Sequence, residues 1–386
     1  MSGPAAAGLH AAFLVSGVVT VILGPLIPEA SARWGLPPSR IGLLFLSQFI
    51  SSSAGAAVAS RRPRRSVVLG YALIGAGLAA VATGSFPVAL GAMALVGLGL
   101  GLSIPATNVI VARRHPESRG AALSRLNLVW GIGAVISPLL FMTLPPRLRV
   151  AGVLLPLAGL AALAALGLSQ VLPADPPPAS SPGDRATGKP SGAPLAVAAG
   201  QLFLVVGTES ALGGWMVAAY PEGGPLPPLM VGGGFWGAFL LGRGLAPALL
   251  RHLREGTLHA GALGVAGLGV TLVLLARSGT AIAAGALLAG LGLGPLFPLV
   301  VSSLTALVDE SRWRHAGAVF AVGGLGGAAL PWLVGRLGES LGVLRFGFAV
   351  PLLAILVMGL LLGLHRVVST GRAGAPALPV PPAQGA

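Results

Sequence analysis

The chain has 386 residues, of which 54% are hydrophobic and 9% are charged. Soluble domains carry about 25% charged residues, so this composition excludes a soluble enzyme and predicts a polytopic membrane protein. The net charge of +14 comes from arginines in short clusters between apolar runs, which is typical of membrane topology rather than of nucleic-acid binding. The absence of cysteine excludes disulfides, thiolate catalysis and cysteine metal sites.

Twelve runs of the chain are apolar enough to cross a bilayer, which takes about 20 residues each. They are 9–31, 40–60, 66–84, 87–112, 120–143, 149–172, 195–220, 229–249, 257–277, 279–307, 316–337 and 341–364. The first run follows no charged leader or cleavage site, so we expect it to be a retained helix.

The twelve runs fall into two groups of six. Residues 173–194 are rich in Pro, Ser and Gly and predict a flexible cytoplasmic linker. Residues 370–386 predict a disordered tail. We therefore expect an all-α membrane protein with two pseudo-symmetric six-helix bundles, at 1–172 and 195–369.

The basic residues predict the orientation. With the N-terminus inside, 15 of the 24 lie on the inner side, 7 lie on the outer side, and Arg125 and Arg243 lie within spans. The positive-inside rule then places both termini in the cytoplasm. We expect a multi-pass protein of the inner membrane.

The two halves repeat at a constant offset of 193 residues. Three landmarks of the first half recur in the second. The fourth run repeats in the tenth, with Gly97, Gly99, Gly101 and Pro105 matching Gly290, Gly292, Gly294 and Pro298. The Glu-Ser-Arg triplet at 117–119 recurs at 310–312, and Gly131, Gly133 and Pro138 of the fifth run match Gly324, Gly326 and Pro331 of the eleventh. Parallel six-helix repeats that place a binding site near the midplane are a known transporter architecture.

The twelve spans and the arginine cluster at 55–70 resemble the major facilitator superfamily. The sequence GAAVASRRPRRSVVLG is similar to that family's signature loop, although the usual aspartate of the loop is missing. Segments 126–134, 207–220 and 235–243 resemble the fucose–galactose–glucose permease branch. This resemblance implies a carrier that works by alternating access, and not an enzyme.

Glu209 is the one acidic residue well inside a span, where a charge costs on the order of 2.5–3.5 kcal/mol. It either forms a fixed ion pair with Arg243 of the next span or binds substrate, with or without a coupled proton. Proton-coupled relatives carry acidic residues in spans one and four, and this chain has Gly24 and Ile104 there. Glu29 lies at the outer end of the first span and is expected to be interfacial.

Other polar and aromatic residues within spans are candidates for the binding site. Gln201, Thr208 and Trp215 are spaced by seven and share a helical face, which favours either sugar recognition or helix packing. Asn127 and Trp130 meet on one face at a spacing of three. The remaining candidates are single residues: Gln48, Asn108 and Trp236.

Several motifs carry no chemistry in this context. The Gly-x-Gly-x-Gly runs lie within apolar helices and favour close helix packing, not nucleotide binding. The histidines lack metal-ligand spacing, and no catalytic residue, metal or cofactor is expected.

The leading interpretation is a monomeric carrier of a neutral hexose-like sugar, with a possible proton coupled through Glu209 and with membrane lipid as its surroundings. A drug–proton antiporter, a lipid carrier and a non-transporting receptor are the alternatives.

Overall fold

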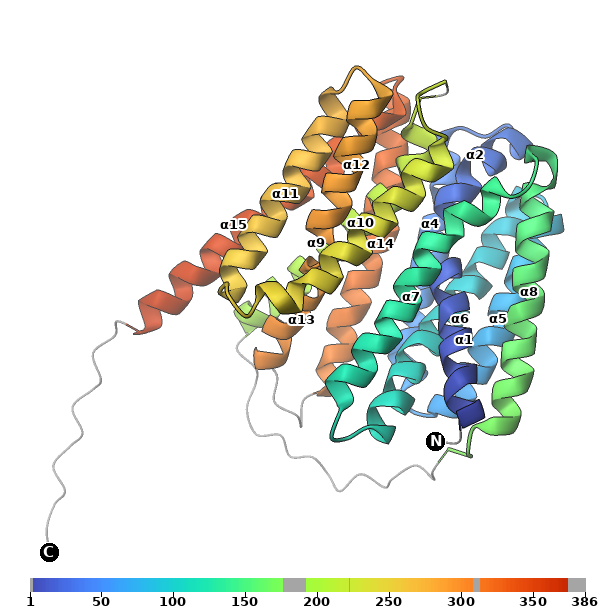
Figure 1. Ribbon diagram of the computed structural model, residues 1–386, viewed down its shortest axis with the longest axis horizontal. Helices are drawn as coiled ribbons and strands as arrows, with labels where there is room; N and C mark the ends of the chain where they lie inside the picture. The colour runs from blue at the N-terminus through green and yellow to red at the C-terminus, as the bar shows by residue number, and fades with distance from the viewer. Residues whose placement is uncertain (1–2, 176–191, 222, 308–312, 374–386) are drawn as a thin grey trace, which may run out of the picture.

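The computed structural model describes residues 3–175, 192–221, 223–307 and 313–373, and every regular element in these ranges is a helix (Figure 1). The N-terminal half contains α1 (Gly3–Thr20), α2 (Leu23–Trp34), α3 (Pro38–Ile41), α4 (Leu43–Ala59), α5 (Pro63–Thr83), α6 (Phe86–Arg114), α7 (Arg119–Met142) and α8 (Pro146–Val171). The C-terminal half contains α9 (Gly192–Ala219), α10 (Pro228–Leu249), α11 (Glu255–Leu275), α12 (Gly279–Leu293), α13 (Leu296–Leu307), α14 (Trp313–Ser340), the 3₁₀ helix η2 (Leu344–Phe348) and α15 (Ala349–Ala373).

These elements make twelve passes in two adjacent bundles, which confirms the predicted architecture. Ten helices of the described chain are long and apolar enough to span a membrane, and the α1–α2 pair, bent by 47°, makes an eleventh. α14, with 28 residues, is also long enough to cross a bilayer. The start of α1 and the end of α15 lie at the same end of the bundles, the lower end in Figure 1. We call this end the terminal face and the opposite end the far face.

The helix boundaries follow local chemistry. Proline occupies the first or second position of α3, α5, α6, α8 and α10, where its missing N–H costs no hydrogen bond. α2 ends at Gly35, whose φ of 62° suits glycine because it lacks a β-carbon.

The helices of each half pack backbone against backbone at glycines. A β-carbon at Gly97 or Gly101 of α6 would collide with the carbonyl oxygens of Gln48 or Ser52 of α4. The repeat partners, Gly290 of α12 and Gly294 just after α12, meet the carbonyls of Phe235 and Phe239 of α10 in the same way. The repeat seen in the sequence is therefore a repeat of helix–helix contacts.

The first and tenth passes are each interrupted next to a proline. Pro25 has no N–H for the carbonyl of Val21, which accepts instead from the Gly24 nitrogen at 3.1 Å. As a result, the carbonyl of Thr20 loses its usual partner. Pro298 likewise cannot donate to the carbonyl of Gly294, at the junction of α12 and α13.

The first turn of α5, which contains part of the arginine cluster, is held to the end of α8 and the chain that follows it. The Arg64 guanidinium donates to the carbonyls of Leu172 (2.9 Å) and Ser169 (2.5 Å), and the backbone nitrogens of Arg64 and Arg65 donate to the carboxylate of Asp175 (2.8 and 3.1 Å). Asp175 thus supplies a negative charge to the N-terminus of α5, although the loop itself lacks its usual aspartate.

The central part of the predicted linker, 176–191, and most of the predicted tail, 374–386, lie outside the described residues. α9 begins at Gly192, within the predicted linker, and α15 continues to Ala373, past the predicted start of the tail at residue 370.

Substituting a contact glycine tests this packing. Gly101→Ala should lower the free energy of unfolding by about 1–3 kcal/mol, because its β-carbon meets rigid backbone of α4. Gly294→Ala should behave in the same way. Gly159→Ala in α8 is the matched control, since nothing lies within 4 Å of its β-carbon. Thermal unfolding in detergent measures all three, and equal stability of the three variants would contradict the assignment.

Candidate functional site

Glu209 of α9 and Arg243 of α10 form a long ion pair. Their closest nitrogen and oxygen atoms, Nη2 and Oε2, are 3.9 Å apart, and the side chains are 14% and 18% exposed. The Oε2 atom of Glu209 has no hydrogen-bond partner among the described residues. The carboxylate of Glu209 therefore lies near the guanidinium of Arg243 but accepts no hydrogen bond from it.

Arg243 has a second partner at the interruption of the tenth pass. Its Nε donates to the carbonyl of Gly294 at 3.1 Å. This carbonyl has no helical partner because Pro298 lacks an N–H. The guanidinium also lies 4.5 Å from the ring centre of Phe239 and 5.9 Å from that of Phe297, a cation–π arrangement. Arg243 thus connects α10, α13 and the carboxylate of α9.

Two tryptophans meet where the halves join. Trp130 of α7 and Trp236 of α10 lie edge to face, with ring centres 6.3 Å apart. Trp236 contacts Phe235 and Phe239, each at 5.2 Å. An aromatic wall therefore runs from Trp130 in the N-terminal half to the guanidinium of Arg243 in the C-terminal half.

Gln48 joins this region through a residue that the sequence analysis missed. Its Nε2 donates to the free carbonyl of Thr20 at 3.1 Å, and the Nε1 of Trp130 donates to the Thr20 hydroxyl at 3.4 Å. The sequence signal that could have found Thr20 is its position just before the interruption that Pro25 causes.

Asn108 and Asn127 bond within their own helices. The Nδ2 of Asn108 donates to the carbonyl of Ile104, and that of Asn127 donates to the carbonyl of Leu123, both at 2.9 Å. Asn108 is half-buried and Asn127 is exposed. The structure records no contact from either amide to the Glu209–Arg243 pair.

The stripe of Gln201, Thr208 and Trp215 is buried. Trp215 is fully buried, and its Nε1 donates to the carbonyl of Pro331 at 2.7 Å while its ring lies 6.0 Å from that of Phe45. The Thr208 hydroxyl has no partner among the described residues. In this conformation Trp215 packs α9 against α14 and α4, and the stripe does not join the aromatic wall.

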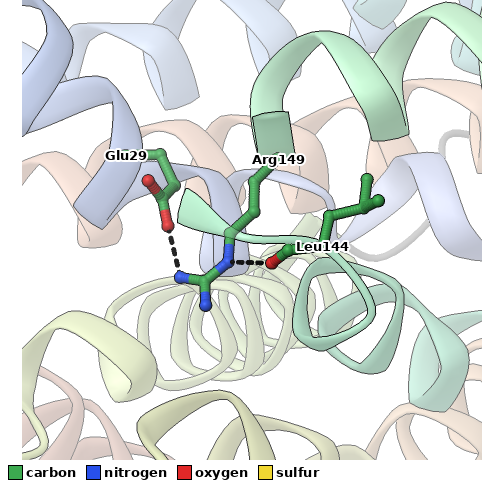
Figure 2. Close-up of polar contacts among 3 residues, drawn as sticks. All are labelled: Glu29, Leu144 and Arg149. Atoms are coloured by element: carbon green, nitrogen blue, oxygen red, sulfur yellow. Dashed lines mark hydrogen bonds and ion pairs between the residues drawn. The ribbon is translucent and has the colours of Figure 1, made fainter. Parts of the chain in front are cut away.

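Glu29 forms a separate ion pair at the far face. Its Oε1 lies 2.7 Å from Nη1 of Arg149 at the start of α8, and the Nε of Arg149 donates to the carbonyl of Leu144 at 3.0 Å (Figure 2). Figure 2 shows the guanidinium between these two partners. Glu29 thus ties α2 to the turn between α7 and α8, away from the aromatic wall.

The two halves contact each other at the far face. The Ser39 nitrogen donates to Oε2 of Glu339 at 2.9 Å, and Gly335 and Trp332 of α14 lie against Pro38 and Gly42. Hydrogen bonding from Ser39, aided by the charge of Arg336, lowers the pKa of Glu339, which lies at the exposed end of α14. The carboxylate is therefore ionised at neutral pH. We call this set of residues the far-face contact.

Comparison with known proteins identifies the class. A sequence model of the Major Facilitator Superfamily matches residues 9–255. The chain therefore belongs to this superfamily and is a multi-pass membrane transporter, not an enzyme. A search of curated proteins finds no match.

Solved structures share the fold at low identity. The E. coli fucose:proton symporter is 16% identical, with a TM-score of 0.63 over 93% of this chain and 98% of that chain. A D-xylose–proton symporter is 15% identical, with a TM-score of 0.77 over 93% and 96%. A bacterial homologue of the human lysosomal transporter Spinster, in an inward-facing conformation, is 13% identical, with a TM-score of 0.73 over 98% and 100%.

Cross-linking tests whether the far-face contact must open during transport. Because the chain has no cysteine, a Ser39→Cys/Glu339→Cys pair needs no further change for labelling. A short bis-thiosulfonate reagent, which forms a disulfide with each cysteine and releases a sulfinate, should stop transport, and reduction of the disulfides should restore it. The two single-cysteine variants, treated in the same way, are the controls. Full transport by a cross-linked pair would show that the contact stays closed throughout the cycle.

The pH dependence of this contact follows from the lowered pKa of Glu339. Its contribution should be complete at neutral pH and should be lost only as the pH falls below the ordinary range of a glutamate. Labelling of a single Ser39→Cys variant should therefore be unchanged between pH 7 and pH 6 and should rise only when the pH falls below the ordinary pKa of a glutamate. Glu339→Gln in the same background should remove that rise, and a rise of equal size in this variant would assign it to another group.

Proposed function

We propose that this chain transports a neutral, hexose-like sugar by alternating access, with Glu209 as the group that binds a coupled proton. The observation that carries the proposal is the aromatic wall ending at the Glu209–Arg243 pair, where the two halves join. We further propose that the terminal face is cytoplasmic, in keeping with the distribution of arginines, and that the carrier acts as a monomer in the inner membrane.

The chemistry of these groups suits a sugar. The faces of tryptophan rings pack against the C–H faces of a pyranose, and carboxylate and amide groups bond its hydroxyls. Trp130 and Trp236 come from different halves and contact each other, so a ligand packed against this pair would contact both halves. Gln48, Asn108 and Asn127 would add hydrogen bonds from the N-terminal half, and Gln201, Thr208 and Trp215 would join in another conformation of the cycle. Two of the structures with this fold are named as sugar–proton symporters.

The long ion pair supports a coupling role for Glu209. A carboxylate in the apolar interior is costly unless it is paired or protonated, and here the nearest cation is 3.9 Å away with no hydrogen bond. Protonation of Glu209 would remove its attraction for Arg243, which would keep its bond to Gly294 and its contact with Phe239. The proton would thus change the charge next to the substrate without exposing an unpartnered guanidinium.

A specific observation also favours a second function, drug–proton antiport. Phe235, Phe239 and Phe297 make the region around Trp236 and Arg243 strongly aromatic, as an apolar drug would require. The same carboxylate could serve such an exchanger. Transport of sugars or of hydrophobic dyes by the purified protein separates the two functions.

Counterflow of labelled D-glucose and a small sugar panel in proteoliposomes tests the leading proposal. The wild type should exchange sugar and accumulate it when a pH gradient is imposed. Glu209→Gln should keep exchange within about threefold but lose accumulation at least tenfold, because the amide cannot bind and release a proton. Glu29→Gln is the matched control, since it makes the same change in a far-face ion pair. An absence of exchange of every sugar by folded protein would overturn the proposal and favour dye transport.

Trp236 tests the role of the aromatic wall. Trp236→Ala should raise the half-saturation concentration for sugar about tenfold, or about 1.4 kcal/mol, through loss of ring contact. Trp34→Ala removes a tryptophan from a comparable edge-to-face pair, 5.5 Å from Phe86, away from the wall. This control should leave half-saturation unchanged. Equal effects of both variants would indicate a general loss of packing.

A further inference from the structure

Thr20 occupies the same place in the first half of the chain as Glu209 does in the second. A β-carbon at Gly133 of α7 would meet the carbonyl of Leu14, and its repeat partner Gly326 of α14 would meet that of Phe203. Leu14 and Phe203 are therefore equivalent residues of the first and seventh passes. They are 189 residues apart, so the offset between these two passes is 189, whereas it is 193 between the glycine motifs of the later passes. The offset of 189 also relates Thr20 to Glu209.

A second contact supports this equivalence. Gly24 and Gly213 are also 189 residues apart, and a β-carbon at Gly24 would lie 2.6 Å from the carbonyl oxygen of Gly213. Two equivalent residues can touch in this way only close to the axis that relates the halves. Thr20 and Glu209 therefore stand on either side of that axis, each four residues before the contact.

The surroundings of Thr20 point to a role in the site. Its hydroxyl donates to the carbonyl of Ser16 at 2.6 Å and accepts from Nε1 of Trp130 at 3.4 Å, while its carbonyl accepts from Gln48 at 3.1 Å. Thr20 is half-buried, and Gln48 is almost fully buried. Three different passes thus converge on one residue at the interruption of the first pass.

We infer that Thr20 is a positioning residue that fixes the Trp130 ring, and that it is the neutral counterpart of Glu209 in the N-terminal half of the binding site. This inference rests on the proposed function. The hydroxyl holds the indole nitrogen, so the ring face stays in the orientation that meets Trp236. Because the groups that meet at Thr20 are an amide, an indole and backbone carbonyls, which carry no charge, the charge that responds to a proton lies in the C-terminal half, at Glu209.

An isosteric pair of variants tests the hydroxyl. Thr20→Val removes it at nearly constant volume, and Thr20→Ser keeps it. Thr20→Val should raise the half-saturation concentration for sugar five- to twentyfold with maximal exchange within twofold of the wild type, and Thr20→Ser should stay within twofold for both. Thr83→Val is the matched control, since Thr83 makes the same bond to the carbonyl four residues earlier, at 3.1 Å, on an exposed position.

A coupling test separates positioning from packing. If Thr20 acts through Trp130, Thr20→Val should change half-saturation less than twofold in a Trp130→Phe background, because that background already lacks the indole nitrogen. A full five- to twentyfold effect in that background would overturn the inference. Equal impairment by Thr20→Val and Thr20→Ser would also overturn it, because a packing role does not distinguish the hydroxyl.

A fluorescence measurement keeps the inference testable apart from the substrate. Thr20→Val should shift the emission and acrylamide quenching of Trp130, obtained by subtracting the Trp130→Phe spectrum, and Thr83→Val should not. If the wild type exchanges no sugar, the proposed function fails while this measurement still decides whether Thr20 holds Trp130. An unchanged Trp130 signal in folded Thr20→Val protein would overturn the inference, even if sugar exchange is present.

Discussion

The contact of backbone with backbone at glycines is the constraint on which the rest of this structure depends. In lipid, apolar helices gain little from the hydrophobic effect when they associate, so close van der Waals packing decides their arrangement. Gly97 and Gly101 bring α6 onto α4, and Gly290 and Gly294 bring α12 onto α10 at matching positions. These contacts fix both bundles, and they place Gln48 and Phe239 next to the two interruptions.

Within this repeated frame, the two halves differ in charge. The carbonyl of Thr20, which lacks its helical partner, accepts a hydrogen bond from the neutral amide of Gln48. The carbonyl of Gly294, which also lacks its helical partner, accepts one from the guanidinium of Arg243. A guanidinium inside the membrane needs a counter-charge, which Glu209 provides at 3.9 Å. The repeat thus keeps the glycine contacts at matching positions in both halves. The polar groups do not match, because Thr20 and Glu209, which are equivalent in the repeat, are a hydroxyl and a carboxylate.

The far-face contact and the aromatic wall both join the same pair of bundles, so the rigid-body exchange that we propose for this transporter would change both. Ser39 and Glu339 join the halves at one end, and Trp130 and Trp236 join them deeper in the interface. A change of orientation between the bundles would alter both contacts. Substrate binding at the aromatic wall would therefore affect closure of the far-face contact through the bundles themselves.

The sequence by itself determined the membrane setting, the twelve passes, the two halves and their repeat, because hydrophobic runs and a fixed offset are local and additive signals. It offered pairing with Arg243 as one of two alternatives for Glu209, since the two residues lie in consecutive spans, and the structure places them 3.9 Å apart. Only the tertiary structure shows that Trp130 contacts Trp236 and that Thr20 bonds both Gln48 and Trp130. It also shows that Trp215 packs between helices and that Asp175 accepts hydrogen bonds from the start of α5. These contacts depend on the rotation, bending and crossing of helices far apart in the chain, which one-dimensional spacing does not specify.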